Sequence, residues 1–503
     1  MAFRKAQTGK DDALFIASSS IKVLSSQAVL TAFSLAFNMY LARTLSTTLF
    51  ALIMVYGIVN SVVRLLSDLG IYATLVQKVP GLISRGDKET AVGLMKFVLV
   101  NRLAFAGAAS LAVAVSAGLI SRLFLKTDAY ALAILLMLPG SFFASVSDGL
   151  ALNSQAIRRF GLTSLAKLAG GIALIVCSTT LYLFFGVKGY LIGLGLGPFL
   201  QTCVNFIGLR DFLFAKGKMP HWSKTLRYSF PFYLRALMLF ALQESDRLIT
   251  GILLPPAVFA GYGIARKFTD YINLYGESIE TPMLIKLAET AGKPEQALIS
   301  AYSKVARYGL MVIAPPCLAV ACASPFLMTL FGGSRYSRYW PILTILAISR
   351  AAYFLSTLLG GMMVFVLGSP VKTLLMDAIP GIINPVASIV LISIFGQSGT
   401  AWSQIITFIC ATMVARCLLK KIIQTRISFS DFRIVFQSFL PAALIVFLAQ
   451  TFFSSMPVIA VCLFFGALVF LTLHMIMMED RDWAMAERIA PVFLMAPALK
   501  LKR

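Results

Sequence analysis

The sequence has little charge for its length. Of its 503 residues, 13% are charged and 59% are hydrophobic, and the mean hydropathy is +0.85. This composition excludes a soluble globular domain, in which about 25% of the residues are charged. Continuous apolar runs of the roughly 20 residues that cross a bilayer recur from end to end, and the short alternating segments of a β-barrel are missing. The sequence therefore predicts an all-α, polytopic membrane protein.

Histidine and cysteine are scarce as well. The chain has two histidines and seven cysteines, and no cysteine pair has metal-ligand spacing with a histidine. We interpret the cysteines, which all lie in apolar runs, as small buried hydrophobic residues. The sequence also contains no Ser-His-Asp set, P-loop or ATP-hydrolysing domain, so we expect neither an enzyme nor a cofactor. The cysteines are Cys177, Cys203, Cys317, Cys322, Cys410, Cys417 and Cys462.

Charged residues and Pro/Gly-marked breaks divide the apolar runs into fourteen predicted spans. Gly193, Gly195 and Gly197 lie within one span, so they indicate close helix packing rather than a nucleotide loop. The spans are 14–42, 46–72, 95–120, 129–152, 162–184, 187–209, 229–253, 256–284, 308–331, 339–367, 371–394, 398–419, 434–454 and 456–477.

Lysine and arginine are distributed unevenly between the two sides of the predicted membrane. With the N-terminus in the cytoplasm, and with borderline residues near span ends such as Lys96 and Arg416 counted with the adjoining loops, thirty of the 44 lie in cytoplasmic segments and six lie on the opposite side. This positive-inside pattern predicts that both termini are cytoplasmic. The net charge of +23 then reflects topology and contact with anionic lipid rather than nucleic-acid binding.

The remaining eight cations lie inside predicted spans, where each costs about 2.5–3.5 kcal/mol by insertion scales. Each of them therefore needs a partner, water or a ligand. They are Lys22, Arg64, Arg102, Arg235, Arg247, Arg266, Lys267 and Arg350.

Two polar stripes indicate that residues 25–80 are repeated 209 positions later. The spacing i, i+4, i+7, i+11 places each stripe on one helical face. Six spans separate the copies, so the repeat is parallel, a plan in which transporters bind substrate between their halves. The first stripe is Gly57, Ser61, Arg64 and Asp68, and the second is Arg266, Asp270, Asn273 and Glu277.

We expect these buried charges to line a water-filled, basic cavity. The cations near mid-depth are too many for the carboxylates to shield from lipid, and guanidinium groups bind phosphate oxygens bidentately, which favours a pyrophosphate or an acidic sugar. The alternative is a set of internal salt bridges, such as Arg266 with Asp270 at i, i+4. The candidate substrate-binding residues are Asn38, Arg64, Arg235, Arg247, Arg266, Lys267, Asn273 and Arg350. The candidates for ion coupling or charge balance are Asp68, Glu244, Asp246, Asp270 and Glu277.

Two hairpins of the sequence carry a family resemblance. Residues 38–80, NMYLARTLSTTLFALIMVYGIVNSVVRLLSDLGIYATLVQKVP, resemble the opening hairpin of bacterial polysaccharide transporters, and residues 229–265 are similar to the second-half signature of that family. The sequence departs from the pattern at residues 45–48, where a Leu-Gly-Pro turn is usual, and at Ala51, where glycine is usual. The matching positions are Asn38, Leu41 to Arg43, Phe50, Asp68 to Gly70, Lys78, Pro231, Asp246, Arg247, Gly261, Tyr262 and Ala265.

These transporters, the Wzx-type flippases, belong to the multidrug/oligosaccharidyl-lipid/polysaccharide exporter superfamily. The resemblance implies translocation of undecaprenyl-pyrophosphate-linked oligosaccharide across the bacterial inner membrane by alternating access. It also implies a polymerase and a chain-length regulator as partners, and two six-helix bundles with an extra C-terminal helix pair. The expected segments are an N-terminus at 1–13, bundles at 14–209 and 229–420, a connector at 210–228, the extra pair at 434–478 and a tail at 479–503.

Three other readings stay open at this point. A cation-coupled drug exporter of the same superfamily would favour carboxylates over the eight cations found here. A lipid II flippase shares the fourteen spans and the basic cavity. A polytopic ligase or polymerase would use a large outside loop, whereas the predicted outside loops are short.

Overall fold

The computed structural model describes residues 34–157, 159–288, 309, 313–365 and 370–419, together with a few single residues between 441 and 472. Within these ranges the chain is helical and contains no strand. The predicted spans 434–454 and 456–477, and the first part of 14–42, lie outside the described residues. After a helix at 34–44, the helices are α2 (Thr47–Asp68), α3 (Ile71–Ser84), α4 (Lys88–Val115), α5 (Ala117–Leu125), α6 (Ala131–Ala156), α7 (Phe160–Leu213), α8 (Trp222–Leu253), α9 (Pro256–Ala288), α11 (Ser324–Gly332), α12 (Ser334–Ser337), α13 (Trp340–Phe365), α14 (Pro370–Phe395) and α15 (Gly399–Leu419), with a 3₁₀ turn at Gly396–Ser398.

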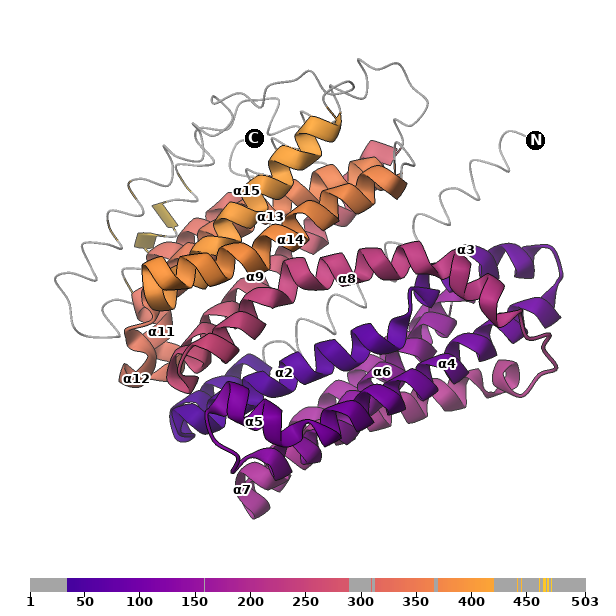
Figure 1. The fold of residues 1–503 in the computed structure, drawn as a ribbon, viewed down its shortest axis with the longest axis horizontal. Helices are drawn as coiled ribbons and strands as arrows, with labels where there is room; N and C mark the ends of the chain where they lie inside the picture. Colours follow the sequence, from indigo (N-terminus) through magenta and orange to yellow (C-terminus); the bar gives the residue numbers. More distant parts are fainter. Residues whose placement is uncertain are drawn as a thin grey trace. The chain divides into compact units, whose positions relative to one another are not determined.

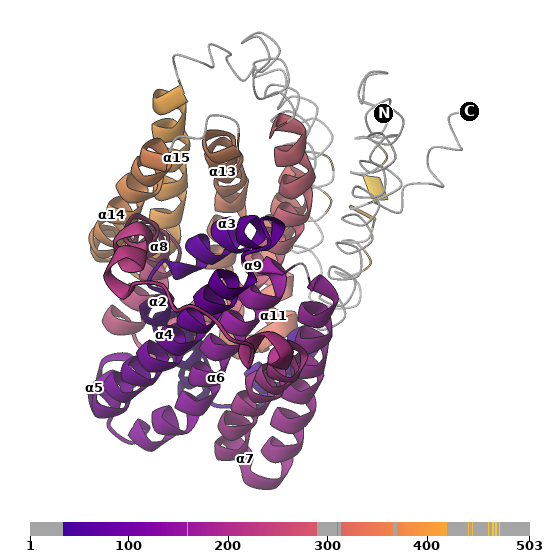
Figure 2. The same cartoon turned by 90° about the vertical axis from the view of Figure 1, so that its right-hand side faces the viewer.

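The chain divides into two compact units. Unit 1 comprises Met1–Ile264, Phe331–Gly333 and Leu374–Thr407, and unit 2 comprises Ala265–Leu330, Ser334–Thr373 and Phe408–Arg503. In unit 1, α2, α4 and α6 run side by side and α7 packs along α6 (Figures 1 and 2).

The described helices confirm the predicted all-α membrane fold. Six of them are long and apolar enough to cross a membrane, or up to seven when a bent pair, Ile313–Cys322 and Ser324–Gly332, is taken as one span. Two of the six, Phe160–Leu213 and Lys372–Leu419, each contain two predicted spans. The total of fourteen spans and the cytoplasmic termini stay predictions.

The 54-residue helix α7 turns back on itself at Gly186, where the backbone leaves the helical region (φ 61, ψ −144). Its two limbs then pack so closely that a Cβ added at Gly193 would lie 2.4 Å from the Cα of Ser178. Gly195 approaches the backbone of Gly140 in α6 in the same way. The prediction that these glycines serve helix packing is therefore confirmed.

Helices α8 and α9 coincide with the predicted spans 229–253 and 256–284 and have 32 and 33 residues. They are absent from the set of strongly apolar helices among the described residues. The reason is visible in their sequences, because these two helices carry most of the candidate site residues.

The helix that follows α2 was not predicted from the sequence. The predicted span 46–72 ends at Asp68, because Leu69 and Gly70 both adopt the left-handed conformation (φ 47 and 69). The chain then forms α3, where an extramembrane loop was expected. Every fourth residue of α3 is apolar, and Ile71, Leu75 and Val79 are buried in one cluster with residues of α4.

The prediction that the cysteines are buried is wrong for most of them. Of the six cysteines in the described part of the chain, Cys317 is buried, Cys417 is exposed and the other four are half-buried. The prediction failed because the outward faces of the spans are apolar too. Large hydrophobic side chains such as Phe184, Phe185 and Met413 are more than half exposed there.

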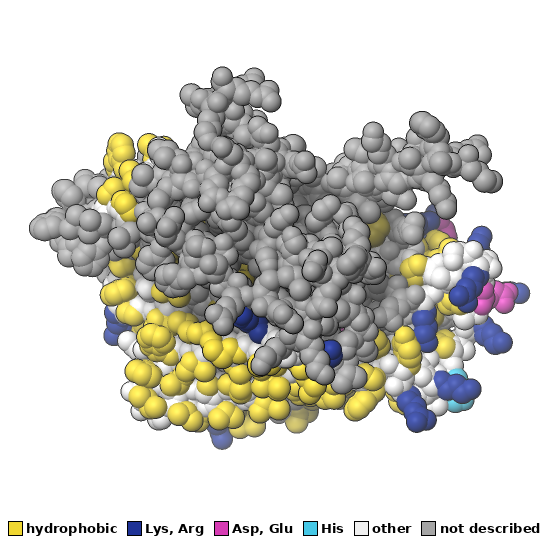
Figure 3. Space-filling view, turned by 90° about the horizontal axis from the view of Figure 1, so that it is seen from above, with side chains coloured by type: hydrophobic (Ala, Val, Ile, Leu, Met, Phe, Trp, Pro, Cys, Tyr) yellow, Lys and Arg dark blue, Asp and Glu magenta, His cyan; other side chains and the backbone are white. Residues whose placement is uncertain are grey.

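Lysine and arginine side chains gather at the end of unit 1 where α3 and the connection between α7 and α8 lie (Figure 3). Hydrophobic side chains cover much of the remaining described surface in that view. The exposed cations of this end include Lys78, Arg85, Lys88, Lys216 and Lys218. All five belong to segments that the sequence assigns to the cytoplasm.

Candidate functional site

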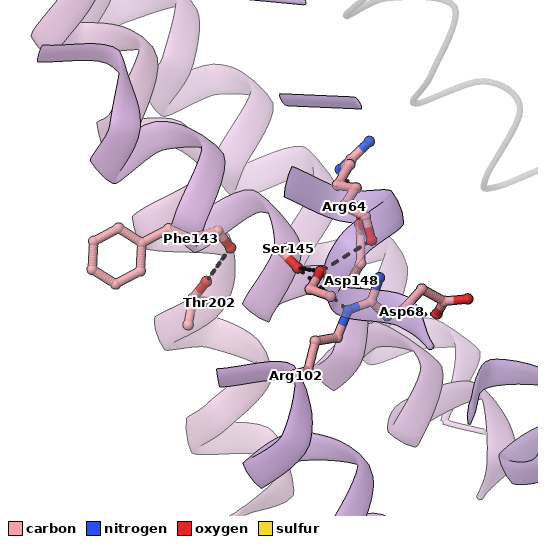
Figure 4. Close-up of polar contacts among 8 residues, drawn as sticks. Arg64, Asp68, Arg102, Phe143, Ser145, Asp148 and Thr202 are labelled. Carbon is pink, nitrogen blue, oxygen red and sulfur yellow. Dashed lines mark hydrogen bonds and ion pairs between the residues drawn. The ribbon is translucent and has the colours of Figure 1, made fainter. Parts of the chain in front are cut away.

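An ion pair joins the first polar stripe to α6. Nη2 of Arg64, from α2, donates to Oδ1 of Asp148 at 3.1 Å, and Nε of the same arginine lies 2.9 Å from Oδ2 (Figure 4). Both carboxylate oxygens therefore lie against the Nε and Nη2 side of the guanidinium. The side chains stay 44% and 33% exposed, so the pair is open on one side.

A second, more buried pair lies beside the first. Nη1 of Arg102, from α4, is 3.6 Å from Oδ1 of Asp68, and its Nε lies 3.4 Å from the hydroxyl of Ser145 (Figure 4). Gly149 makes room for this side chain, because a Cβ there would lie 2.8 Å from Cδ of Arg102. The four charges sum to zero, so lipid-facing α2, α4 and α6 can hold them without a net buried charge.

Local helix geometry explains why these groups meet. Arg64 and Asp68 are four residues apart on α2, and Ser145, Asp148 and Gly149 fall within slightly more than one turn of α6. Residues three and four apart share a helix face. The facing sides of α2 and α6 therefore carry the carboxylates of Asp68 and Asp148.

Helix α8 contributes two further pairs to unit 1. Arg247 is 3.0 Å from Glu244 one turn earlier, and both side chains are largely buried. A Cβ added at Gly57 would lie 3.4 Å from Nη2 of Arg247, so this glycine of the first stripe leaves space for the guanidinium. Asp246 accepts a short hydrogen bond from the hydroxyl of Tyr262, and both residues are fully buried.

The other α8 pair crosses to α14. Nε of Arg235 is 2.7 Å from Oδ2 of Asp377. The Arg235 side chain is 39% exposed, whereas that of Asp377 is 8% exposed. A buried carboxylate thus anchors an arginine whose side chain stays partly exposed.

The second stripe lies in unit 2. Arg266 and Asp270 are 3.3 Å apart, which confirms that these residues pair at i, i+4. Asn273 and Glu277 line a small cavity together with Glu280, Arg350 and other residues. Arg350 is 2% exposed, and its guanidinium lies 5.3 Å from the ring centre of Phe408. The hydroxyl of Thr357 donates to Glu280 at 3.1 Å.

Two predicted residues lie apart from these groups. Asn38 is buried, and its Nδ2 donates to the carbonyl of Ser34 at 2.7 Å in its own helix. Lys267 is half-buried and is not among the residues that line the unit 2 cavity. Within the residues that the structure describes, no three His, Cys, Asp or Glu side chains are grouped as metal ligands.

Asp148 and Asp377, which pair with two of the predicted arginines, were not among the site residues predicted from the sequence. A signal was present, since each is the one carboxylate in its predicted span, 129–152 and 371–394. The sequence alone does not indicate which distant helix faces which arginine.

Known proteins bear on what this arrangement does. The family model described as "Polysaccharide biosynthesis protein" matches residues 40–341. No curated protein sequence matches the chain significantly.

Three solved structures show the same fold. A lipid II flippase, MurJ, in an inward closed conformation has a TM-score of 0.72 at 16% identity, over 91% of this chain and 98% of its own. An inward-facing multidrug resistance MATE family transporter of the MOP superfamily has a TM-score of 0.63 at 16% identity, over 78% and 95%. A mutant of the Vibrio cholerae MATE transporter VcmN has a TM-score of 0.56 at 14% identity, over 80% and 93%.

Proposed function

The chain belongs to the polysaccharide biosynthesis protein family, and from this premise we propose that it flips undecaprenyl-pyrophosphate-linked oligosaccharide across the bacterial inner membrane. It is a multi-pass transporter of the flippase type rather than an enzyme. The proposed substrate is a lipid pyrophosphate that carries sugars destined for O-antigen, capsule or exopolysaccharide. In the proposed mechanism, the protein alternates between states that are open to one side of the membrane or to the other.

The observation that carries the proposal is the exposure of Arg64 and Arg235. Each is an arginine in a membrane-spanning segment that keeps 44% or 39% of its side chain accessible while a carboxylate holds it. An arginine in a membrane-spanning segment that faced only lipid would carry a cost in free energy. An anionic headgroup that passes the site removes this cost, because phosphate oxygens match the guanidinium fork.

The carboxylates beside these arginines suit a transporter. Asp148 and Asp377 compensate the charge of these two arginines in the empty protein and leave part of each arginine side chain exposed. Asp68, Glu244, Asp270 and Glu277 supply the same kind of charge balance in this proposal, and each lies close to an arginine or in the cavity with one.

Arg64→Ala tests the proposal in cells that depend on this protein for surface polysaccharide. We expect the variant to reach the membrane at normal abundance and to lose export, with lipid-linked repeat units held on the cytoplasmic leaflet. Arg122→Ala is the matched control, because Arg122 forms an exposed pair with Asp128 outside the predicted spans. Normal surface polysaccharide in the Arg64→Ala strain would remove Arg64 from the site.

The deletion strain tests the substrate itself. If the protein flips the lipid-linked repeat unit, its loss leaves that unit accessible only from the cytoplasmic side. Repeat units that reach the periplasmic leaflet normally in the deletion strain would exclude this function.

Lipid II is the second candidate substrate, favoured by the TM-score of 0.72 with the lipid II flippase over nearly the whole of both chains. Its headgroup is also a sugar on a lipid pyrophosphate, so the same arginines would serve. Expression of this protein in cells depleted of their own lipid II flippase separates the two. Restored growth assigns lipid II, and unrestored growth with restored polysaccharide export assigns the oligosaccharide.

A polymerase and a chain-length regulator are the proposed partners. The reason is chemical, since flipped repeat units accumulate unless they are joined into polymer on the far side. Export in cells that lack the polymerase would then stop at single repeat units.

A further inference from the structure

We propose that Asp148 and Asp377 are positioning residues, each of which holds one edge of an arginine so that the opposite edge is free to bind a phosphate group. This inference rests on the proposed function, because it concerns the same arginines. It assigns a role to two carboxylates that the sequence reading did not single out.

The atoms used by the Arg64 pair support this assignment. Nη2 of Arg64 donates one hydrogen to Oδ1 of Asp148, and Nε lies 2.9 Å from Oδ2 of the same carboxylate. A guanidinium has five N–H donors in a rigid plane, so the second Nη2 hydrogen and the Nη1 hydrogen parallel to it lie on the edge away from Asp148. That edge presents parallel donors to two oxygens of one phosphate.

The Arg235 pair repeats the arrangement on different helices. Asp377 of α14 also takes Nε, at 2.7 Å, and the exposed fraction falls from 39% on the arginine to 8% on the aspartate. In both pairs the arginine is the more exposed partner and the carboxylate comes from another helix. The largely buried pair of Arg247 and Glu244, within one helix, lacks these features.

Arg102 explains why Arg64 turns to Asp148 and not to Asp68. Asp68 is four residues after Arg64 on α2, a spacing at which an arginine and an aspartate usually pair. The almost fully buried Arg102 lies 3.6 Å from Asp68 and Ser145 lies beside it, so that carboxylate already has a cation. Arg64 therefore reaches across to α6, which directs its outer edge away from α2.

A competing role for Asp148 predicts the opposite result. If the carboxylate were a counter-ion that phosphate must displace, its removal would strengthen phosphate binding. If it positions Arg64 through the Nε edge, its removal leaves the arginine with many rotamers and weakens binding. Binding affinity therefore separates the two roles by sign.

The experiment uses the purified full-length protein in detergent with inorganic pyrophosphate as the probe, measured by titration calorimetry. We expect Asp148→Asn to raise the Kd for pyrophosphate about tenfold and Arg64→Ala to raise it further, with Asp377→Asn acting like Asp148→Asn. Asp128→Asn is the control, because Asp128 holds an arginine outside the predicted spans. The double variant Arg64→Asp with Asp148→Arg restores the ion pair in reverse and moves the cation to α6.

Thermal unfolding of each variant shows whether the fold survives. The variant with the reversed pair then distinguishes a purely structural role of the ion pair from positioning of Arg64 for phosphate binding. A purely structural pair regains both stability and pyrophosphate binding on reversal, whereas a positioned ligand group regains stability alone. An unchanged or lower Kd for Asp148→Asn overturns the inference. Absence of pyrophosphate binding by the unmodified protein would instead contradict the proposed substrate class.

Discussion

At the scale of single residues, position 70 requires glycine for two separate reasons. Its backbone is left-handed (φ 69), a conformation that costs residues with a Cβ about 1–2 kcal/mol. A Cβ at this position would also lie 2.4 Å from the carbonyl oxygen of Ser229 and from the amide nitrogen of Tyr233. Gly70 thus lets the end of α2 and the start of α3 rest on the backbone of α8.

We predict that Gly70→Ala destabilises the protein by roughly 2–5 kcal/mol, the sum of the backbone cost and an overpacking cost. Gly86→Ala is the matched control, because Gly86 has φ 82 but nothing lies within 4 Å of its added Cβ. Thermal unfolding in detergent measures both variants. Equal losses for the two would show that α3 does not press against α8.

At the scale of elements, α8 and α14 meet along a repeated line of polar and close contacts in unit 1. Arg235 pairs with Asp377, the backbone of Met238 approaches Gly381, and the carbonyl of Leu242 accepts from Nδ2 of Asn384 at 2.9 Å. The intervals of three, four and seven residues keep one face of each helix in contact. This line holds the segment of α8 that carries Arg235 against α14.

Asn384→Ala tests how much this line contributes. Asn384 is fully buried, and its Oδ1 lies 3.3–3.4 Å from donors on Ser403, Gln404 and Thr407 of α15. Loss of the shared acceptor leaves buried polar groups poorly satisfied, so we predict a loss of about 1–3 kcal/mol. Ser393→Ala, an exposed site on the same helix whose hydroxyl bonds only its own helix, is expected to change stability by less than about 0.5 kcal/mol in the same unfolding assay.

The helices themselves were predictable because each span is specified by its own apolar length. The hairpins of α7 and of α14 with α15, and even the charged α8 and α9, fall where the sequence placed them. Helix α3 was not predicted, because its first apolar residues continue the apolar run of α2. The break between the two helices is a left-handed turn at Leu69 and Gly70, and leucine does not usually indicate such a conformation.

The site was predictable only as far as helix geometry reaches. The pair of Arg266 and Asp270 lies within one helix, so spacing alone identified it. Asp148 and Asp377 approach their arginines from other helices, and tertiary packing decides that choice.

At the scale of the whole molecule, the distribution of charge makes a prediction about sidedness. Exposed lysines and arginines gather around α3 and the connection between α7 and α8, whereas the turns near Asp128 and Gln397 carry few cations. The positive-inside rule assigns the basic end to the cytoplasm. This orientation also sets the direction of transport, since lipid-linked sugars are assembled on the cytoplasmic leaflet in the proposed function.

Thiol labelling can test this orientation with four exposed positions that remove no charge. In a variant whose seven cysteines are replaced, we expect Ala129→Cys and Gln397→Cys to react with a membrane-impermeant maleimide in intact spheroplasts. Ser84→Cys and Ser223→Cys should react only after the membrane is opened, because their segments carry the cytoplasmic cations. The cysteine-free parent has to export polysaccharide normally, which shows that the replacements leave the fold intact. Labelling of Ser84→Cys in intact spheroplasts, with protection of Ala129→Cys, would reverse the assigned orientation and with it the predicted cytoplasmic termini.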